Sequence, residues 1–108
     1  MTTGIVAEFN NLDERRYERV NELLNLYQNP PKGLLLHSAG PIPGGWRVVD
    51  IWESREAFDQ FFKDRLSGAL KQAGVTEPPT KQDFFPIHNA YAPKPNLLSR
   101  LTATVESR

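Results

Sequence analysis

Short apolar runs alternate along the chain with longer stretches in which apolar residues recur at helical spacing. Residues 4–9 (GIVAEF) form the first run and end at two asparagines, as a strand closed by a turn does. Between 13 and 29, apolar side chains repeat every three or four positions behind Asp13, a good N-cap, until the prolines of NPPKG break the pattern. The pattern therefore predicts a strand over 4–9 and a helix over 13–29.

Two further strands are predicted next, joined by a tight connection. Residues 34–39 (LLLHSA) form an apolar run that follows the prolines. The glycines and prolines of 40–45 (GPIPGG) are typical of a hairpin connection. Residues 44–54 (GGWRVVDIWES) then supply the third strand, which is apolar on both of its faces.

A second helix and a fourth strand complete the pattern. Ser54 can cap the helix, whose apolar stripe continues until Gly74. Residues 83–91 (DFFPIHNAY) resemble a strand at a sheet edge, because they contain a proline. Residues 1–91 therefore form one predicted domain. The tail over 92–108 is either a loosely attached terminus or an arm that packs on a partner subunit and covers its leucines.

The order strand, helix, strand, strand, helix, strand predicts an α+β, ferredoxin-like βαββαβ fold. Its four-stranded antiparallel sheet has strands one and three in the centre and both helices on one face. On three of the strands, one set of alternate residues is entirely apolar, and this set should face the helices. Its members are Ile5, Ala7, Phe9, Val49, Ile51, Phe85 and Ile87. The opposite face would carry Val6, Glu8, Val48, Asp50, Trp52, Phe84 and His88, together with His37. This second face is too apolar for a monomer, so we expect a second copy of the chain to cover it.

The second face also holds the residues best suited to chemistry. Burying Asp50 without a partner would cost several kcal/mol, so it needs a neighbouring cation, hydrogen-bond donor or water. An ion pair at a subunit seam and an acid in a cavity both meet this need. His37 and His88 can transfer protons near neutral pH, although a lone histidine is often structural. Trp52 serves either as packing or as a stacking wall.

Composition narrows the classes of partner. Thirteen basic side chains balance thirteen acidic ones, and the third strand lacks the signature of RNA-recognition domains, so no nucleic-acid partner is expected. There is no cysteine, so no disulfide or thiol nucleophile is possible. No run approaches the roughly 20 apolar residues of a membrane span, so a cytoplasmic protein is the default expectation. His37, His88 and Asp50 have the composition of a metal set, but the two histidines would lie on opposite edge strands, about 14 Å apart. No metal site is therefore predicted.

The runs GLLLHSAG, GGWRVVDIWESREAFDQFFKDRL and FFPIHN, placed on these elements, resemble the dimeric α/β-barrel superfamily. The closest likeness is to its antibiotic-biosynthesis-monooxygenase-like branch of small domains, over residues 4–91. The resemblance implies a homodimer in which two sheets meet face to face and enclose a cavity lined by the faces that point away from the helices.

The resemblance also implies a function and a set of site residues. Members include cofactor-independent monooxygenases, lyases, isomerases and proteins without known activity, so fold alone does not settle function. We expect binding and transformation of an aromatic or polyketide-like small molecule, with a non-catalytic ligand-binding or structural dimer as the alternative. No cofactor is expected, because both predicted helices lack the histidine of the haem-degrading members. The expected catalytic residues are His37, Asp50 and His88. The expected substrate-binding residues are Trp52, Phe84, Tyr91 and Glu8. Tyr17, like Tyr91, is a phenol donor that packing alone would also explain.

Overall fold

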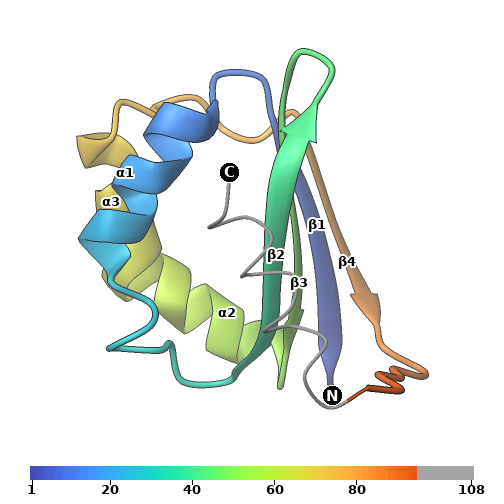
Figure 1. Ribbon diagram of the computed structural model, residues 1–108. Coiled ribbons are helices and arrows are strands. Elements are labelled where there is room, and N and C mark those ends of the chain that lie inside the picture. The colour runs from blue at the N-terminus through green and yellow to red at the C-terminus, as the bar shows by residue number, and fades with distance from the viewer. Residues whose placement is uncertain (95–108) are drawn as a thin grey trace.

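The computed structural model describes residues 1–94 and places a four-stranded antiparallel sheet against a layer of helices (Figure 1). The elements follow in the order β1 (Thr3–Phe9), α1 (Glu14–Leu24), β2 (Leu34–Ile42), β3 (Gly45–Trp52), α2 (Arg55–Phe61), the π-helical η1 (Phe62–Leu66), α3 (Ser67–Gln72) and β4 (Lys81–Pro86). The strand order is β2-β3-β1-β4, so β1 and β3 are central and the predicted ferredoxin-like α+β fold is confirmed. Of the predicted tail over 92–108, residues 95–108, which include the leucines whose packing was predicted, lie outside the described residues.

Both predicted helix caps are present, but the first helix is shorter than its pattern suggests. The Asp13 carboxylate accepts from the Arg16 N–H at 2.9 Å, and the Ser54 hydroxyl accepts from the Ala57 N–H at 3.0 Å. Helix α1 ends at Leu24 because Asn25 adopts the left-handed conformation, with φ 52°, that closes many helices. The predicted extension to residue 29 is therefore wrong, and Tyr27 is exposed.

The second helical region contains a π-helical segment that its sequence pattern does not reveal. Segments α2, η1 and α3 follow one another without a break, and η1 inserts an extra residue into the helical register. Arg65, within η1, donates at 2.8 Å to the carbonyl oxygens of Leu24 and Asn29. These bonds satisfy the last carbonyl group of α1 and one in the loop that follows it, and they attach both to the second helical region.

Strand β4 begins at Lys81, two residues before its predicted start, and ends at Pro86 rather than at residue 91. Its partner β1 explains both limits, because Lys81 pairs with Glu8 and Pro86 pairs with Thr3. The chain beyond Ile87 has no further strand residue to pair with, so the prediction of a strand over 83–91 is wrong at both ends.

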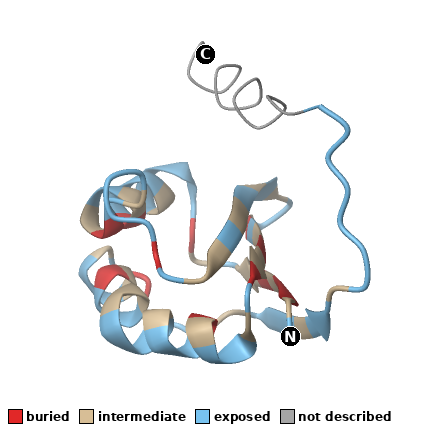
Figure 2. Cartoon of the chain, turned by 90° about the horizontal axis from the view of Figure 1, so that it is seen from below, coloured by how far each residue is buried: buried red, intermediate tan, exposed pale blue. Residues whose placement is uncertain are grey.

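The assignment of side chains to the two faces of the sheet is right for β1 and wrong for β3, for β4 and for His37 of β2. Directly paired residues share a face, and one row across the sheet consists of His37, Asp50, Ile5 and Phe84. This row faces the helices, as does Trp52, whose ring lies against Phe58 of α2. Buried residues accordingly gather between the sheet and the helices (Figure 2).

The outer face carries the residues that were expected inside. Val49, Ile51 and Phe85 point away from the helices, and the Phe85 ring, 43% exposed, lies over Gly4. The inverted parity is possible because the buried carboxylate of Asp50 has hydrogen-bond donors on the helix side of the sheet. Apolarity alone therefore ranked the two faces of β3 in the wrong order.

Candidate active site

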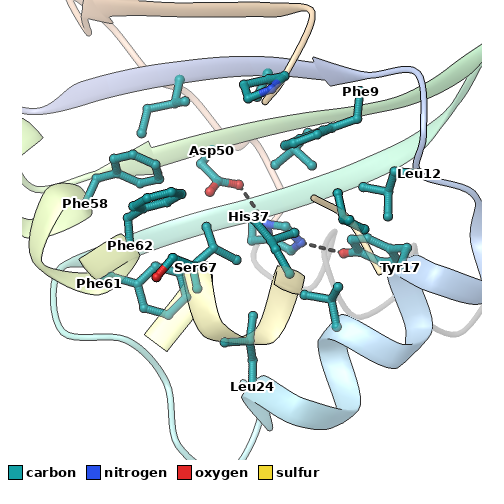
Figure 3. Close-up of a pocket in the computed structure, with 18 of the residues that line it drawn as sticks. Phe9, Leu12, Tyr17, Leu24, His37, Asp50, Phe58, Phe61, Phe62 and Ser67 are labelled. Atoms are coloured by element: carbon teal, nitrogen blue, oxygen red, sulfur yellow. Dashed lines mark hydrogen bonds and ion pairs between the residues drawn. The ribbon is translucent and has the colours of Figure 1, made fainter. Parts of the chain in front are cut away.

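A pocket of about 610 Å³ lies between the sheet and the helices (Figure 3). Its wall is mainly apolar and draws on every strand of the sheet and on each helical segment. The side chains that bound its polar centre and aromatic wall are Tyr17, Asn21, His37, Asp50, Trp52, Phe58, Phe61, Phe62 and Leu66. The volume falls in the range of pockets that hold small organic molecules. The pocket lies on the helix side, rather than on the face that points away from the helices.

Four polar side chains form one continuous hydrogen-bonded chain in this pocket. His37 Nδ1 lies 2.7 Å from Asp50 Oδ1, and His37 Nε2 lies 2.5 Å from the Tyr17 hydroxyl. The second carboxylate oxygen of Asp50 accepts from Trp52 Nε1 at 3.1 Å. The Asp50 carboxylate is 10% exposed, and within residues 1–94 it is satisfied by these donors with no ion pair to lysine or arginine. Figure 3 shows the carboxylate, imidazole and phenol in line across the pocket.

Local strand geometry brings His37 and Asp50 together. The two residues are direct cross-strand partners in β2 and β3. The register between these strands shifts between Leu34 and Leu36, so Leu35 is an extra residue in β2. Without this bulge, alternation would turn His37 to the outer face, because Leu34 already points inward opposite Trp52. The bulge therefore aims the imidazole into the pocket.

Tyr17 reaches the same point from the helical layer. It lies one turn into α1, where its N–H donates to the Asp13 carbonyl at 2.8 Å. Its ring is nearly parallel to the His37 ring, at an angle of 11° and 6.0 Å between centroids, and it contacts Trp46 at 5.3 Å. Burial raises the pKa of Tyr17 to about 12, and the negative charge of Asp50 acts in the same direction, against the neighbouring Asn21 amide. Tyr17 is therefore a neutral phenol at neutral pH.

The chemistry of these groups sets the direction of the hydrogen bonds. A carboxylate only accepts, so His37 carries its proton on Nδ1 when it is bonded to Asp50. The neutral ring then has a lone pair on Nε2, which accepts from the Tyr17 hydroxyl. The arrangement is that of a base oriented by a carboxylate, and its basic end points toward the pocket.

Aromatic side chains form the wall beside this base. The Trp52 ring is fully buried and lies 5.6 Å from Phe58 and 5.3 Å from Phe61, between ring centroids. Phe62 extends the wall and lies 6.3 Å from Phe58. The rings of Phe61 and Phe62, which are less buried than that of Trp52, offer stacking surface to a flat, apolar ligand.

The remaining predicted site residues do not line the pocket. Phe84 is on the inner face, but it packs against Phe58 and beneath the Arg55 guanidinium at 3.4 Å. Glu8 is on the outer face, where it accepts from Arg47 at 2.9 Å. His88 and Tyr91 follow the end of β4 and are exposed. Within residues 1–94, no three His, Cys, Asp or Glu side chains gather as a metal site requires.

Tyr17 and the three phenylalanines of the second helical region are the pocket residues that sequence reasoning passed over or treated as packing. Phe58, Phe61 and Phe62 follow helical spacing, which marks them as inward-facing but does not distinguish a pocket wall from a solid core. Tyr17 lies on the inward stripe of its helix, one turn after the cap. The available signal for Tyr17 was its polar hydroxyl group among the apolar side chains on the inward face of α1.

Comparison with known proteins supports the fold. No protein-family model matches the chain, and no curated protein does. Among solved structures, a Chloroflexus aurantiacus J-10-fl protein that bears the name antibiotic biosynthesis monooxygenase superposes with a TM-score of 0.64, at 10% identity over 85% of this chain and 98% of its own. A Caulobacter crescentus CB15 protein of the same name has a TM-score of 0.60, at 14% identity over 82% of this chain and 91% of its own.

A third solved structure bears an activity in its name. SnoaB, a cofactor-independent oxygenase from Streptomyces nogalater, superposes with a TM-score of 0.56, at 14% identity over 86% of this chain and 97% of its own. The predicted resemblance is confirmed at the level of the fold: the chain has the fold of the antibiotic-biosynthesis-monooxygenase-like domains. No helix among residues 1–94 has the length and apolarity to cross a membrane.

Proposed function

We propose that this protein binds a small hydroxylated aromatic molecule in the pocket and oxygenates it without a cofactor. The observation that carries the proposal is a carboxylate-oriented imidazole whose basic end points into an apolar pocket with an aromatic wall. A base is what a phenol needs to become a phenolate, and flat rings are what an aromatic ligand needs to stack. The likeness to a cofactor-independent oxygenase adds support at the level of the fold.

The chemistry balances with molecular oxygen as the only oxidant. Removal of the hydroxyl proton places negative charge on the ring carbon para to the oxygen, and this carbon forms a bond with O₂. The proton held by the base returns to the distal oxygen and gives a hydroperoxide. Cleavage of the O–O bond with loss of the hydrogen on that carbon releases water and leaves a quinone. One oxygen atom enters the product, the other enters water, and the substrate supplies all four electrons.

The protein's part in this reaction is proton transfer and positioning. The Asp50 carboxylate stabilises the imidazolium that forms on His37, because His37 Nδ1 and Asp50 Oδ1 are 2.7 Å apart and the carboxylate is only 10% exposed. Trp52 holds the second carboxylate oxygen, so the carboxylate cannot rotate freely. The apolar wall limits water around the phenolate, which strengthens these electrostatic interactions.

Oxygen uptake with α-naphthol tests the proposal. The wild-type protein should consume one O₂ for each naphthoquinone formed, and the rate should fall in His37→Ala and in Asp50→Asn. Ser38→Ala is the matched control, because it is the next residue on β2 and its side chain points to the outer face. Binding of the naphthol without oxygen uptake would indicate the alternative, a non-catalytic binding protein. Unchanged rates in both variants would refute the proposed base.

We also propose that the open face of the sheet pairs with a second copy of this chain. One row across this face consists of Leu36, Ile51, Gly4 and Phe85, and the charged side chains Arg47, Glu8 and Lys81 lie in a row four positions along the strands. Apolar side chains in such a patch favour burial against another protein surface. Light scattering should give the mass of a dimer at micromolar concentration, and Ile51→Lys should give that of a monomer. A wild-type monomer at that concentration would contradict the pairing.

A further inference from the structure

Both ring nitrogens of His37 are already occupied. Nδ1 is bonded to Asp50, and Nε2 is bonded to the Tyr17 hydroxyl at 2.5 Å. A ligand in the pocket therefore meets the Tyr17 oxygen before it can meet His37, as long as this hydrogen bond is intact. The phenolic oxygen that donates to His37 keeps lone pairs that can accept a proton from a ligand.

The surroundings of Tyr17 hold its oxygen in place. Its hydroxyl meets the His37 imidazole end to end, its ring contacts the buried indole of Trp46 at 5.3 Å between centroids, and its backbone belongs to the capped first turn of α1. Displacing the hydroxyl to expose His37 Nε2 would require moving this ring away from its contact with Trp46. Retaining the hydroxyl requires no movement.

We propose that Tyr17 is the catalytic residue that receives the substrate's proton and passes its own proton to His37. The inference rests on the proposed function and names its substrate class: small aromatics that enter the pocket with an unionised hydroxyl group. In the step, the ligand's O–H bond breaks and its proton joins the Tyr17 oxygen. The Tyr17 O–H bond breaks at the same time and its proton joins His37 Nε2. The products are a phenolate, a neutral Tyr17 and an imidazolium beside Asp50.

The charges near Tyr17 and His37 favour a neutral ligand over an anionic one. The Asp50 carboxylate lies behind His37, and Glu18 lies next to Tyr17 on α1. Along the pocket wall, Lys71 on α3 and Glu77 in the following loop carry opposite charges. The raised pKa of Tyr17, caused first by burial, is consistent with a site that resists an unbalanced negative charge. A phenolate formed by the relay is balanced by the new imidazolium.

The ionisation of bound α-naphthol under anaerobic conditions tests the relay, because its neutral and ionised forms absorb at different wavelengths. In the wild-type protein the bound probe should ionise about one pH unit or more below the free probe, since an imidazolium forms beside it. In Tyr17→Phe the probe should still bind, within threefold of the wild-type affinity, but should lose this shift. Tyr27→Phe is the matched control, because Tyr27 is 87% exposed. The methyl ether of the naphthol should bind all three proteins alike.

Each outcome decides the question. If the bound probe ionises at as low a pH in Tyr17→Phe as in the wild type, the relay is overturned. The proposed function then still stands, with His37 as the direct base. A wild-type protein that binds the probe without any shift also overturns the relay. Failure of the wild type to bind the naphthol overturns both the relay and the proposed function.

A second measurement needs no change at Tyr17. Fluorotyrosine incorporated throughout gives one ¹⁹F resonance for each of the three tyrosines, and Tyr27→Phe and Tyr91→Phe assign the third to Tyr17 by elimination. The Tyr17 resonance should move when naphthol binds and should move much less with naphthalene, which has the same rings and no hydroxyl. Equal responses to the two probes would overturn the relay.

Discussion

Replacing Asp50 separates its role as a hydrogen-bond acceptor from its role as a charge. In Asp50→Ala, Trp52 Nε1 loses its acceptor in a fully buried position, and His37 Nδ1 loses its acceptor where the side chain is 25% exposed. A buried donor left without an acceptor lowers the free energy of unfolding by about 1–3 kcal/mol, whereas water can partly satisfy His37 Nδ1. With the lost charge-assisted bond added, the free energy of unfolding should fall by about 3–4 kcal/mol.

Asp50→Asn should be much milder in stability and severe in activity. The asparagine oxygen can still accept from Trp52, and its NH₂ can donate to Nδ1 of the other histidine tautomer, so we expect a loss of about 1–2 kcal/mol. The same change reverses the hydrogen bonds, because Nε2 must then carry the proton and donate to Tyr17. Proton abstraction should fall on the order of 10³–10⁴-fold, as when a triad carboxylate becomes an amide.

Urea unfolding at constant m-value measures both losses, and thermal melting should show a decrease of roughly 10–20 °C for the alanine variant. Asp83→Asn is the matched control, because Asp83 is exposed on the outer face of β4. An alanine variant as stable as the wild type would refute the buried network. Equal losses in the two variants would show that the charge, rather than the acceptor geometry, provides the stability.

Three further predictions follow from individual contacts. Folding raises the pKa of Tyr17 from 10 to about 12, so its contribution to the free energy of unfolding is complete below pH 10 and is lost as the pH rises to about 12. Urea titrations at each pH should show that Tyr17→Phe loses less stability than the wild type over that interval. Gly45→Ala should unfold the protein or cost several kcal/mol, since a Cβ there would lie 2.0 Å from a β1 carbonyl oxygen, whereas Gly40→Ala, with open space, should change the melting temperature little. Arg65→Ala should cost about 1–2 kcal/mol by removing the bonds to the carbonyl oxygens of Leu24 and Asn29, and exposed Lys63→Ala less than half of that. Equal effects within either pair of variants would contradict the contact named for it.

Local patterns in the sequence were sufficient for the element order and for the helix starts. Asp13 and Ser54 are caps whose side chains act on the next three residues, so no distant part of the chain is needed to recognise them. Strand, hairpin and helix signals are equally local, and their order leaves few arrangements of a four-stranded sheet. The sequence also singled out Asp50, Trp52 and His37 by chemical type, and the structure brings these three into one hydrogen-bonded chain.

The orientation of that chain could not be read from the strands alone. Strand β3 is apolar on both faces, so its sequence does not indicate which face packs against the helices. The hydrogen-bond partners of Asp50 decide this. The bulge at Leu35 depends on how β2 pairs with β3, and it alone turns His37 inward. Tyr17 completes the site from a helix twenty residues before His37, through a contact that sequence spacing does not report.

The sequence by itself thus determined the ferredoxin-like fold and the identity of most polar groups in the site, because caps, periodicity and turn residues act over a few positions. The tertiary structure decided which face of the sheet forms the pocket and which phenol meets His37. The physical reason is that a buried carboxylate goes where its hydrogen-bond donors are, and here the donors come from β2 and from the indole of Trp52 on the helix side of the sheet.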